Sequence, residues 1–82
     1  MDMKLAVIAI IVEDTEAVAE LNGLLHQFGQ YIIGRMGIPY HKRNVSLISV
    51  AVDAPLDVIN NLSGKIGKIK GVTSKVAYSK TP

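Results

Sequence analysis

The stretch Lys4-Leu-Ala-Val-Ile-Ala-Ile-Ile-Val12 is rich in valine and isoleucine and is almost wholly apolar. A short apolar run of this composition predicts a strand with both faces buried. A second stretch of the same kind extends from Val45 to Val52. We therefore expect these two segments to be the central strands of one sheet.

A helix is expected after each of these strands. Glu13-Asp14-Thr15-Glu16 supplies a capping side chain and first-turn carboxylates, and Gly29 lies where glycine commonly ends a helix. The second helix is expected to start at Asp53-Ala54-Pro55 and to end at Gly71. Each helix has one apolar stripe with spacings of three, four and three, formed by Val18, Leu21, Leu25 and Phe28 in the first and by Ile59, Leu62, Ile66 and Ile69 in the second.

Two more polar segments complete the pattern. Gln30 to Ile38 predicts a weaker, amphipathic strand, Pro39 to Asn44 a hairpin loop, and Val72 to Tyr78 a last strand. In a ferredoxin-like βαββαβ sheet ordered 4-1-3-2, the first and third strands are central, as the ranking by apolarity requires. We predict a single α+β domain over residues 1–82, a ferredoxin-like sandwich with this antiparallel order and two helices on one face.

One face of this sheet has no cover within the chain. Because both helices lie on one side, the other side should alternate to polar residues, yet Leu5 to Val12 is apolar at every position. The chain has 82 residues, 49% of them hydrophobic, and no cysteine, so disulfides cannot add to a small core. We expect self-association through the apolar sheet face, with two sheets packed face to face or edge to edge in a homo-oligomer.

No secretory signal is recognised, and the apolar run from Leu5 to Val12 is too short to span a bilayer. We therefore expect a cytoplasmic protein with no membrane partner.

Catalytic residues and metal ligands are not predicted. A serine nucleophile would need His26 or His41 as its base, and neither lies near a glycine-elbow serine. No metal-binding spacing of histidine or cysteine is present, and the sequence leaves the cofactor unknown. The expected class is a regulatory binding module that is not an enzyme.

A small-molecule effector would bind at loops and helix starts near a subunit interface. Arginine is suited to this role because it can hold a carboxylate or phosphate with two hydrogen bonds. The candidate effector-binding residues are Arg35, His41, Arg43, Asn44, Asn60 and Ser63.

Two alternatives belong to other classes. The first is a small enzyme of the dimeric ferredoxin-like-barrel kind, which would use His41 or an acid in an inter-subunit cavity. The second is a nucleic-acid-binding protein that uses Lys65, Lys68, Lys70 and Lys75, with salt-sensitive retention on DNA as its sign. The central strands lack the exposed aromatic residues of an RNA-recognition sheet, which counts against nucleic acid as a partner.

Three long stretches and two short ones carry a resemblance to a known family. They are Arg35-Met-Gly-Ile-Pro-Tyr40, Arg43-Asn-Val-Ser-Leu-Ile-Ser-Val-Ala-Val-Asp-Ala-Pro55, Ile59-Asn-Asn-Leu-Ser-Gly-Lys-Ile-Gly-Lys-Ile-Lys-Gly-Val72, Val12-Glu-Asp14 and Leu24-Leu-His26. Together they resemble the iron-only hydrogenase system regulators over nearly the whole chain. These are small ferredoxin-like proteins related in shape to ACT domains and to the C-terminal domain of nickel-responsive regulators.

The resemblance implies a role in controlling the assembly or expression of iron-only hydrogenase. It also implies the ACT-like habit of forming oligomers and binding small effectors between subunits. Nickel-responsive regulators carry a ribbon-helix-helix segment and a cysteine metal ligand, and this sequence has neither. The resemblance therefore does not imply operator binding, or nickel sensing by that site.

Overall fold

A computed structural model describes residues 2–80 of the chain. The elements run in the order β1 (Met3–Val12), α1 (Ala17–Gln27), η1 (Gly29–Tyr31, a 3-10 turn), β2 (Ile32–Tyr40), β3 (Val45–Pro55), α2 (Leu56–Gly67) and β4 (Val72–Tyr78). The four strands form one antiparallel sheet in the order β2-β3-β1-β4. Read from the other edge this is the predicted order 4-1-3-2, so the ferredoxin-like α+β fold is confirmed.

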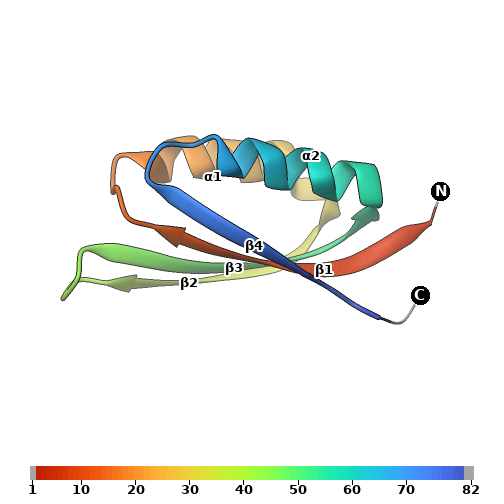
Figure 1. The fold of residues 1–82 in the computed structure, drawn as a ribbon, viewed down its shortest axis with the longest axis horizontal. Helices are drawn as coiled ribbons and strands as arrows, with labels where there is room; N and C mark the ends of the chain where they lie inside the picture. The colour runs from red at the N-terminus through yellow and green to blue at the C-terminus, as the bar shows by residue number, and fades with distance from the viewer. Residues whose placement is uncertain (1, 81–82) are drawn as a thin grey trace.

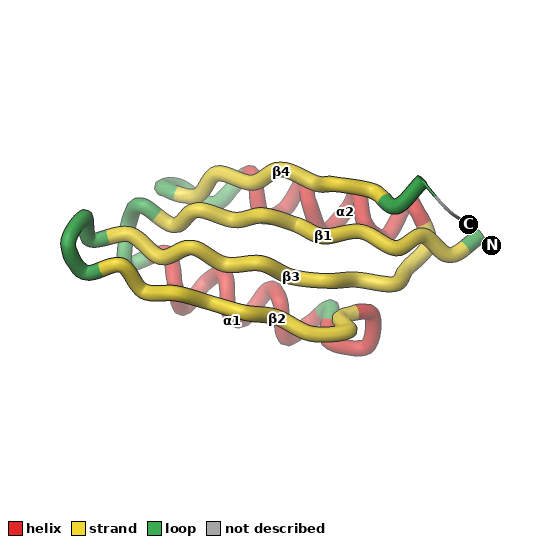
Figure 2. The backbone as a smooth tube through the Cα atoms, turned by 90° about the horizontal axis from the view of Figure 1, so that it is seen from below, coloured by secondary structure: helices red, strands yellow, loops and turns green. Residues whose placement is uncertain are grey.

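The helices form a single layer on one side of the sheet. Figure 1 shows α1 and α2 lying side by side above the strands, and Figure 2 shows the opposite face of the sheet with no element in front of it. Neither helix in the described part of the chain is long and apolar enough to cross a membrane.

The central strand β1 alternates strictly between two environments. Ala6, Ile8, Ile10 and Val12 are buried, whereas the residues between them are exposed. The expectation that this strand is buried on both faces is thus wrong within one chain, because both helices cover the same face. The sequence also predicted an apolar sheet face that no helix covers, and this face is present.

The core lies between this covered face and the helices. Leu21 and Leu25 of α1 and Ile59, Leu62 and Ile66 of α2 are all 2% exposed or less. Burying one such side chain stabilises the fold by about 1.5–3 kcal/mol. The predicted stripes therefore mark the packed faces of both helices, and Val18 and Phe28 lie partly buried at their margin.

Several element boundaries differ from the prediction. α2 ends at Gly67 instead of Gly71, and β2 continues to Tyr40, so Pro39 and Tyr40 lie on the strand and not in the hairpin loop. β3 continues to Pro55, so Asp53 lies on a strand and α2 begins only at Leu56. Pairing explains the extension, because β1 offers partners as far as Met3, which lies opposite Pro55. β2 starts at Ile32 instead of Gln30, since Gly29–Tyr31 forms the 3-10 turn.

Gly71 joins the helix layer to β4 at a position that requires glycine. Its φ is +81°, and a Cβ added there would lie 2.5 Å from the Cβ of Asp14. The carbonyl oxygen of Gly71 also accepts a 2.7 Å hydrogen bond from the backbone N–H of Glu13. A side chain at this position would strain the backbone and collide with the β1–α1 connection.

Candidate functional site

The sheet surface opposite the helices is the most distinctive surface of the protein, and we call it the open face. The strand register assigns its members, because residues directly opposite one another project to the same side of a sheet. They are Met3, Leu5, Val7, Ala9 and Ile11 of β1, Ile33, Met36, Ile38 and Tyr40 of β2, Leu47, Ser49, Ala51 and Asp53 of β3, and Thr73, Lys75 and Ala77 of β4.

The open face is apolar to an extent that is unusual for an exposed surface. Among the described residues, every exposed large hydrophobic side chain except Leu56 and Tyr78 belongs to it, with exposures from 42% to 69%. These nine side chains offer apolar area on the order of 800 Å², about what each partner buries in a standard-size interface. Contiguous apolar patches larger than a few hundred Å² mark interaction sites.

Small side chains near the middle of the open face leave two shallow hollows. The first, of about 220 Å³, lies over Ala9 and Ser49, with Ile11, Met36 and Leu47 in its wall. The second, of about 390 Å³, lies over Ala51 and Ala77, and its other apolar walls include Leu5, Val7 and Ile33. The open face therefore has hollows into which the side chains of a partner could fit.

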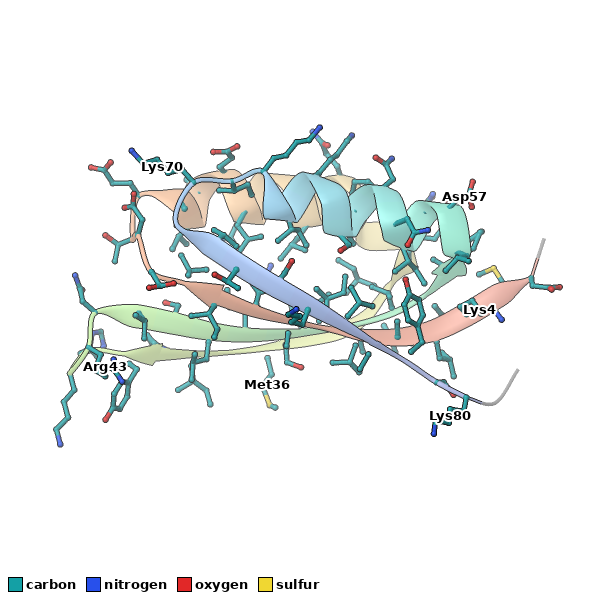
Figure 3. All side chains as sticks on the ribbon, in the orientation of Figure 1. Lys4, Met36, Arg43, Asp57, Lys70 and Lys80 are labelled. Carbon is teal, nitrogen blue, oxygen red and sulfur yellow. The ribbon has the colours of Figure 1, made fainter. Side chains whose placement is uncertain are left out.

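Bulk is unequally divided between the two edge strands of the open face. Ile33, Met36 and Ile38 of β2 are the most exposed large apolar side chains, at 64%, 69% and 57%. Figure 3 shows Met36 projecting away from the helices. The opposite edge, β4, contributes Thr73, Lys75 and Ala77, none of which is large and apolar. One edge of the face is thus raised and apolar, and the other is low and partly polar.

Charge is almost absent from the open face. Among the members named above, all of which lie within residues 2–80, only Asp53 and Lys75 are charged. Both lie at the margin, Lys75 on the edge strand β4 and Asp53 just beyond the pairing between β2 and β3. At the hairpin end, Glu13, Tyr40 and Arg43 line a third hollow of about 430 Å³. An apolar centre with a polar margin is typical of protein interfaces.

The structure separates the predicted effector-binding residues into three groups. Arg35 lies on β2 beside Val50, on the side of the helices, and its Nη2 donates a 2.9 Å hydrogen bond to Oδ1 of Asn22 in α1. Asn60 lies on α2, where its Oδ1 accepts a 3.1 Å hydrogen bond from the hydroxyl of Tyr78 in β4. Because β2 and β4 are opposite edges of the sheet, Arg35 and Asn60 of one chain do not lie in the same site.

The remaining candidates divide between the hairpin and α2. His41, Arg43 and Asn44 lie together in the turn between β2 and β3, where Asn44 adopts a left-handed φ of 57°. Asparagine tolerates that conformation, which gives Asn44 a role in shaping the turn. Ser63 lies on α2, one turn beyond Asn60. The hairpin group and the pair on α2 each consist of residues near in sequence, and the fold brings neither Arg35 nor the α2 pair to the hairpin.

The lysines considered for nucleic-acid binding do not form one patch. Lys65 and Lys68 line a hollow between α1 and α2, and Figure 3 shows Lys70 in the helix layer. Lys75 lies on the opposite side, on the open face. Nζ of Lys65 is 5.6 Å from the centroid of the Phe28 ring, within the range of a cation–π contact.

The described residues hold no desolvated polar centre. Within residues 2–80, no polar or charged side chain is buried, and no three histidine or acidic side chains gather closely enough to hold a metal ion. His41, the residue considered for the enzyme alternative, is exposed in the hairpin turn. Among the surfaces of residues 2–80, the open face has the strongest physical evidence for a function, because it exposes nine large apolar side chains.

The apolar run of β1 predicted its part of the open face, whereas the contribution of β2 was not predicted. Met36, Ile38 and Tyr40 alternate with Gly37 and Pro39, a period of two that marks one side of a strand. This alternation is visible in the sequence and could have placed the three residues on one face. Ile33 was harder to place, because a register shift between Ile32 and Gly34 interrupts the alternation.

The fold and this surface define the class: a ferredoxin-like α+β domain with one sheet face covered by helices and the other apolar and open. The chain belongs to the TM1266-like family of iron-only hydrogenase system regulators, whose sequence model matches residues 4–76. The resemblance inferred from the sequence is therefore confirmed.

The chain is also closely similar to a protein of known structure. The uncharacterized protein TM1266 from Thermotoga maritima superposes with a TM-score of 0.92 at 32% sequence identity, over 96% of this chain and 100% of that chain. No curated protein matches the chain.

Proposed function

We propose that this chain is a cytoplasmic regulatory protein of the iron-only hydrogenase system, not an enzyme, and that it acts as a homo-oligomer held together by the open face. The family supports the link to the hydrogenase system. The open face supports the oligomer and is the observation that carries the proposal, because it exposes nine large apolar side chains.

Covering the open face would solve a stability problem of the isolated chain. A domain of this size buries only roughly 60% of the surface that its unfolded chain exposes, so its own core is small. A second apolar layer on the open face would extend the core on the other side of β1 and β3. Any ligand that binds only the folded state adds to its stability, and a second copy acts in the same way.

An effector, if one controls the oligomer, would bind most readily at the hairpin end. His41, Arg43 and Asn44 gather there, next to the hollow lined by Glu13 and Tyr40. Arg43 can recognise a carboxylate or phosphate group. Arg35 and Asn60 already have partners in α1 and β4, which makes them less available to a ligand.

The test of self-association uses two leucines that are matched in exposure. Leu47 on the open face is 43% exposed, and Leu56 on α2 is 46% exposed. We expect sedimentation velocity at micromolar concentration to show an oligomer for the wild type and for Leu56→Asp but a monomer for Leu47→Asp, because the new carboxylate would be buried unpaired. A monomeric wild type, or an intact Leu47→Asp oligomer, would contradict the proposal.

The regulatory role has its own test in a host that contains an iron-only hydrogenase. Deleting the gene for this protein should change the amount or activity of that hydrogenase, and the wild-type gene should restore both. The Leu47→Asp gene should fail to restore them. Hydrogenase levels and activity that do not respond to the deletion would contradict the link to this system.

A further inference from the structure

The open face carries information about how a second copy would be oriented on it. The raised apolar edge at β2 and the low edge at β4 differ in bulk, and Lys75 lies on the low edge, apart from Arg43 at the hairpin end. Two copies that meet face to face can be related by a two-fold axis that lies in the interface and runs along the strands or across them. The two choices bring different edges together.

An axis across the strands would superpose like on like. β2 would lie over β2 of the partner, with Met36 against its own counterpart, and β4 would lie over β4. The bulky edges would then hold the sheets apart while the low edges left a gap, and the two Lys75 ammonium groups would approach each other. Both effects disfavour this arrangement, since interfaces pack about as densely as protein interiors and like charges repel.

An axis along the strands places each raised edge over a low edge. β2 of one copy would lie over β4 of the other, so that Ile33 and Met36 meet Ala77 and the methylene stem of Lys75. In the two middle strands, the register brings Val7 over Ala51 and Ala9 over Ser49. A lysine at the edge can pack its stem on apolar surface while its ammonium group stays in water.

We propose that the chain forms an isologous dimer in which two open faces pack with their strands roughly aligned, β2 of each copy over β4 of the other. This inference rests on the proposed function, because it specifies the partner and orientation of the same surface. The aligned packing also follows from the spread of the apolar side chains, which run along the strands from Met3 to Tyr40. A crossed packing would cover only the middle of that length.

The occupant is a second copy because the face is complementary to itself. Its apolar area, on the order of 800 Å², is what one side of a stable complex contributes. The large side chains of its raised edge can fill the space above its own low edge. Its charged residues Asp53 and Lys75 lie at the margin, as do Glu13 and Arg43 at the hairpin end, and all of them remain hydrated in the dimer. A different partner would need a surface that is complementary in shape to the open face and carries equally little charge.

Cysteine crosslinking tests the orientation directly, since the natural chain has no cysteine. We would prepare Met36→Cys, Lys75→Cys and the double variant, and treat each with a short bismaleimide reagent. Within one chain the two positions are separated by three strand spacings, roughly 14 Å. Denaturing gels then report only links between copies as a dimer band.

The proposed orientation predicts a dimer band for the double variant and almost none for either single variant. The excess should be on the order of tenfold or more, because two cysteines held in one dimer have an effective concentration near the millimolar range. The pair Ile38→Cys and Thr73→Cys, in the neighbouring row, should behave in the same way. Asp57→Cys, which lies in the helix layer (Figure 3), should give no band.

Each other outcome overturns the inference in a recognisable way. Efficient crosslinking of the single variants would indicate the axis across the strands. A wild type that sediments as a dimer while neither cysteine pair crosslinks would refute the orientation but leave self-association standing. A wild type that is monomeric at micromolar concentration would refute both the orientation and the proposed oligomer. Sedimentation of each cysteine variant before crosslinking shows whether the substitution itself has dispersed the dimer.

Discussion

The two faces of the sheet are made of the same kinds of residue but lie in opposite environments. Ile10 is 1% exposed and its neighbour Ile11 is 42% exposed, and the same contrast holds for Ile8 and Val7. One set packs against α1 and α2, and the other faces away from them. Apolar composition therefore identifies a central strand, but burial within the chain depends on where the helices pack.

This comparison separates stability from association. The covered face should control the free energy of unfolding of one chain, because its side chains contact the helices in every molecule. The open face should control the contact between copies. Substitutions of the adjacent residues Ile10 and Ile11 of β1, and of Tyr78 of β4, can test the two statements separately.

The largest effect is expected on the covered face. Ile10→Ala should lower the free energy of unfolding by about 2–5 kcal/mol, because it removes buried methylene groups and leaves a cavity beside the helices. Urea denaturation followed by circular dichroism would measure the change. A loss below about 1 kcal/mol would mean that this face is less tightly packed than its burial indicates.

A smaller effect is expected from the neighbouring side chain on the open face. Ile11→Ala should weaken self-association roughly tenfold, as truncation of an apolar interface residue commonly does. In dilute solution, where single chains predominate, its free energy of unfolding should fall by less than about 1 kcal/mol. Sedimentation over a range of concentrations would measure the first quantity, and a stability loss as large as that of Ile10→Ala would break the distinction between the faces.

The smallest effect is expected at the edge of the covered face. Tyr78→Phe removes only the hydroxyl that donates to Asn60, an exposed hydrogen bond between β4 and α2. Its loss should cost about 0.5–1 kcal/mol of unfolding free energy and leave the dimer unchanged, since the hydroxyl points to the helix layer. Thermal unfolding would measure the loss of stability, and sedimentation would measure the dimer. A larger loss of stability, or a weaker dimer, would contradict this prediction.

Much of the fold could be predicted because its signals are local. The apolar runs of β1 and β3 and the three-four-three spacings of α1 and α2 are properties of short segments, and each corresponds to an observed element. The strand order followed from the ranking of these segments by apolarity. β4 was predicted with its observed bounds, Val72–Tyr78, since Gly71 and the segment after it carry clear turn and strand signals.

The candidate site was predicted less completely because its members come from distant parts of the chain. Asp53 resembles a residue at a helix start, but the long partner strand β1 extends β3 past it. Arg35 and Asn60 are polar residues of similar promise in the sequence, yet the topology places them at opposite edges. Neither outcome depends on a residue's near neighbours.

The sequence by itself determined the elements, the two central strands and the presence of more apolar strand surface than two helices can cover. Those features depend on composition and periodicity, which are written in consecutive residues. Only the tertiary structure decided which side chains lie on the open face, how its bulk is divided between β2 and β4, and which polar residues are near one another. Register, a bulge in β2 and the placement of both helices on one side set these features, and all three arise from contacts between segments that are distant in the chain.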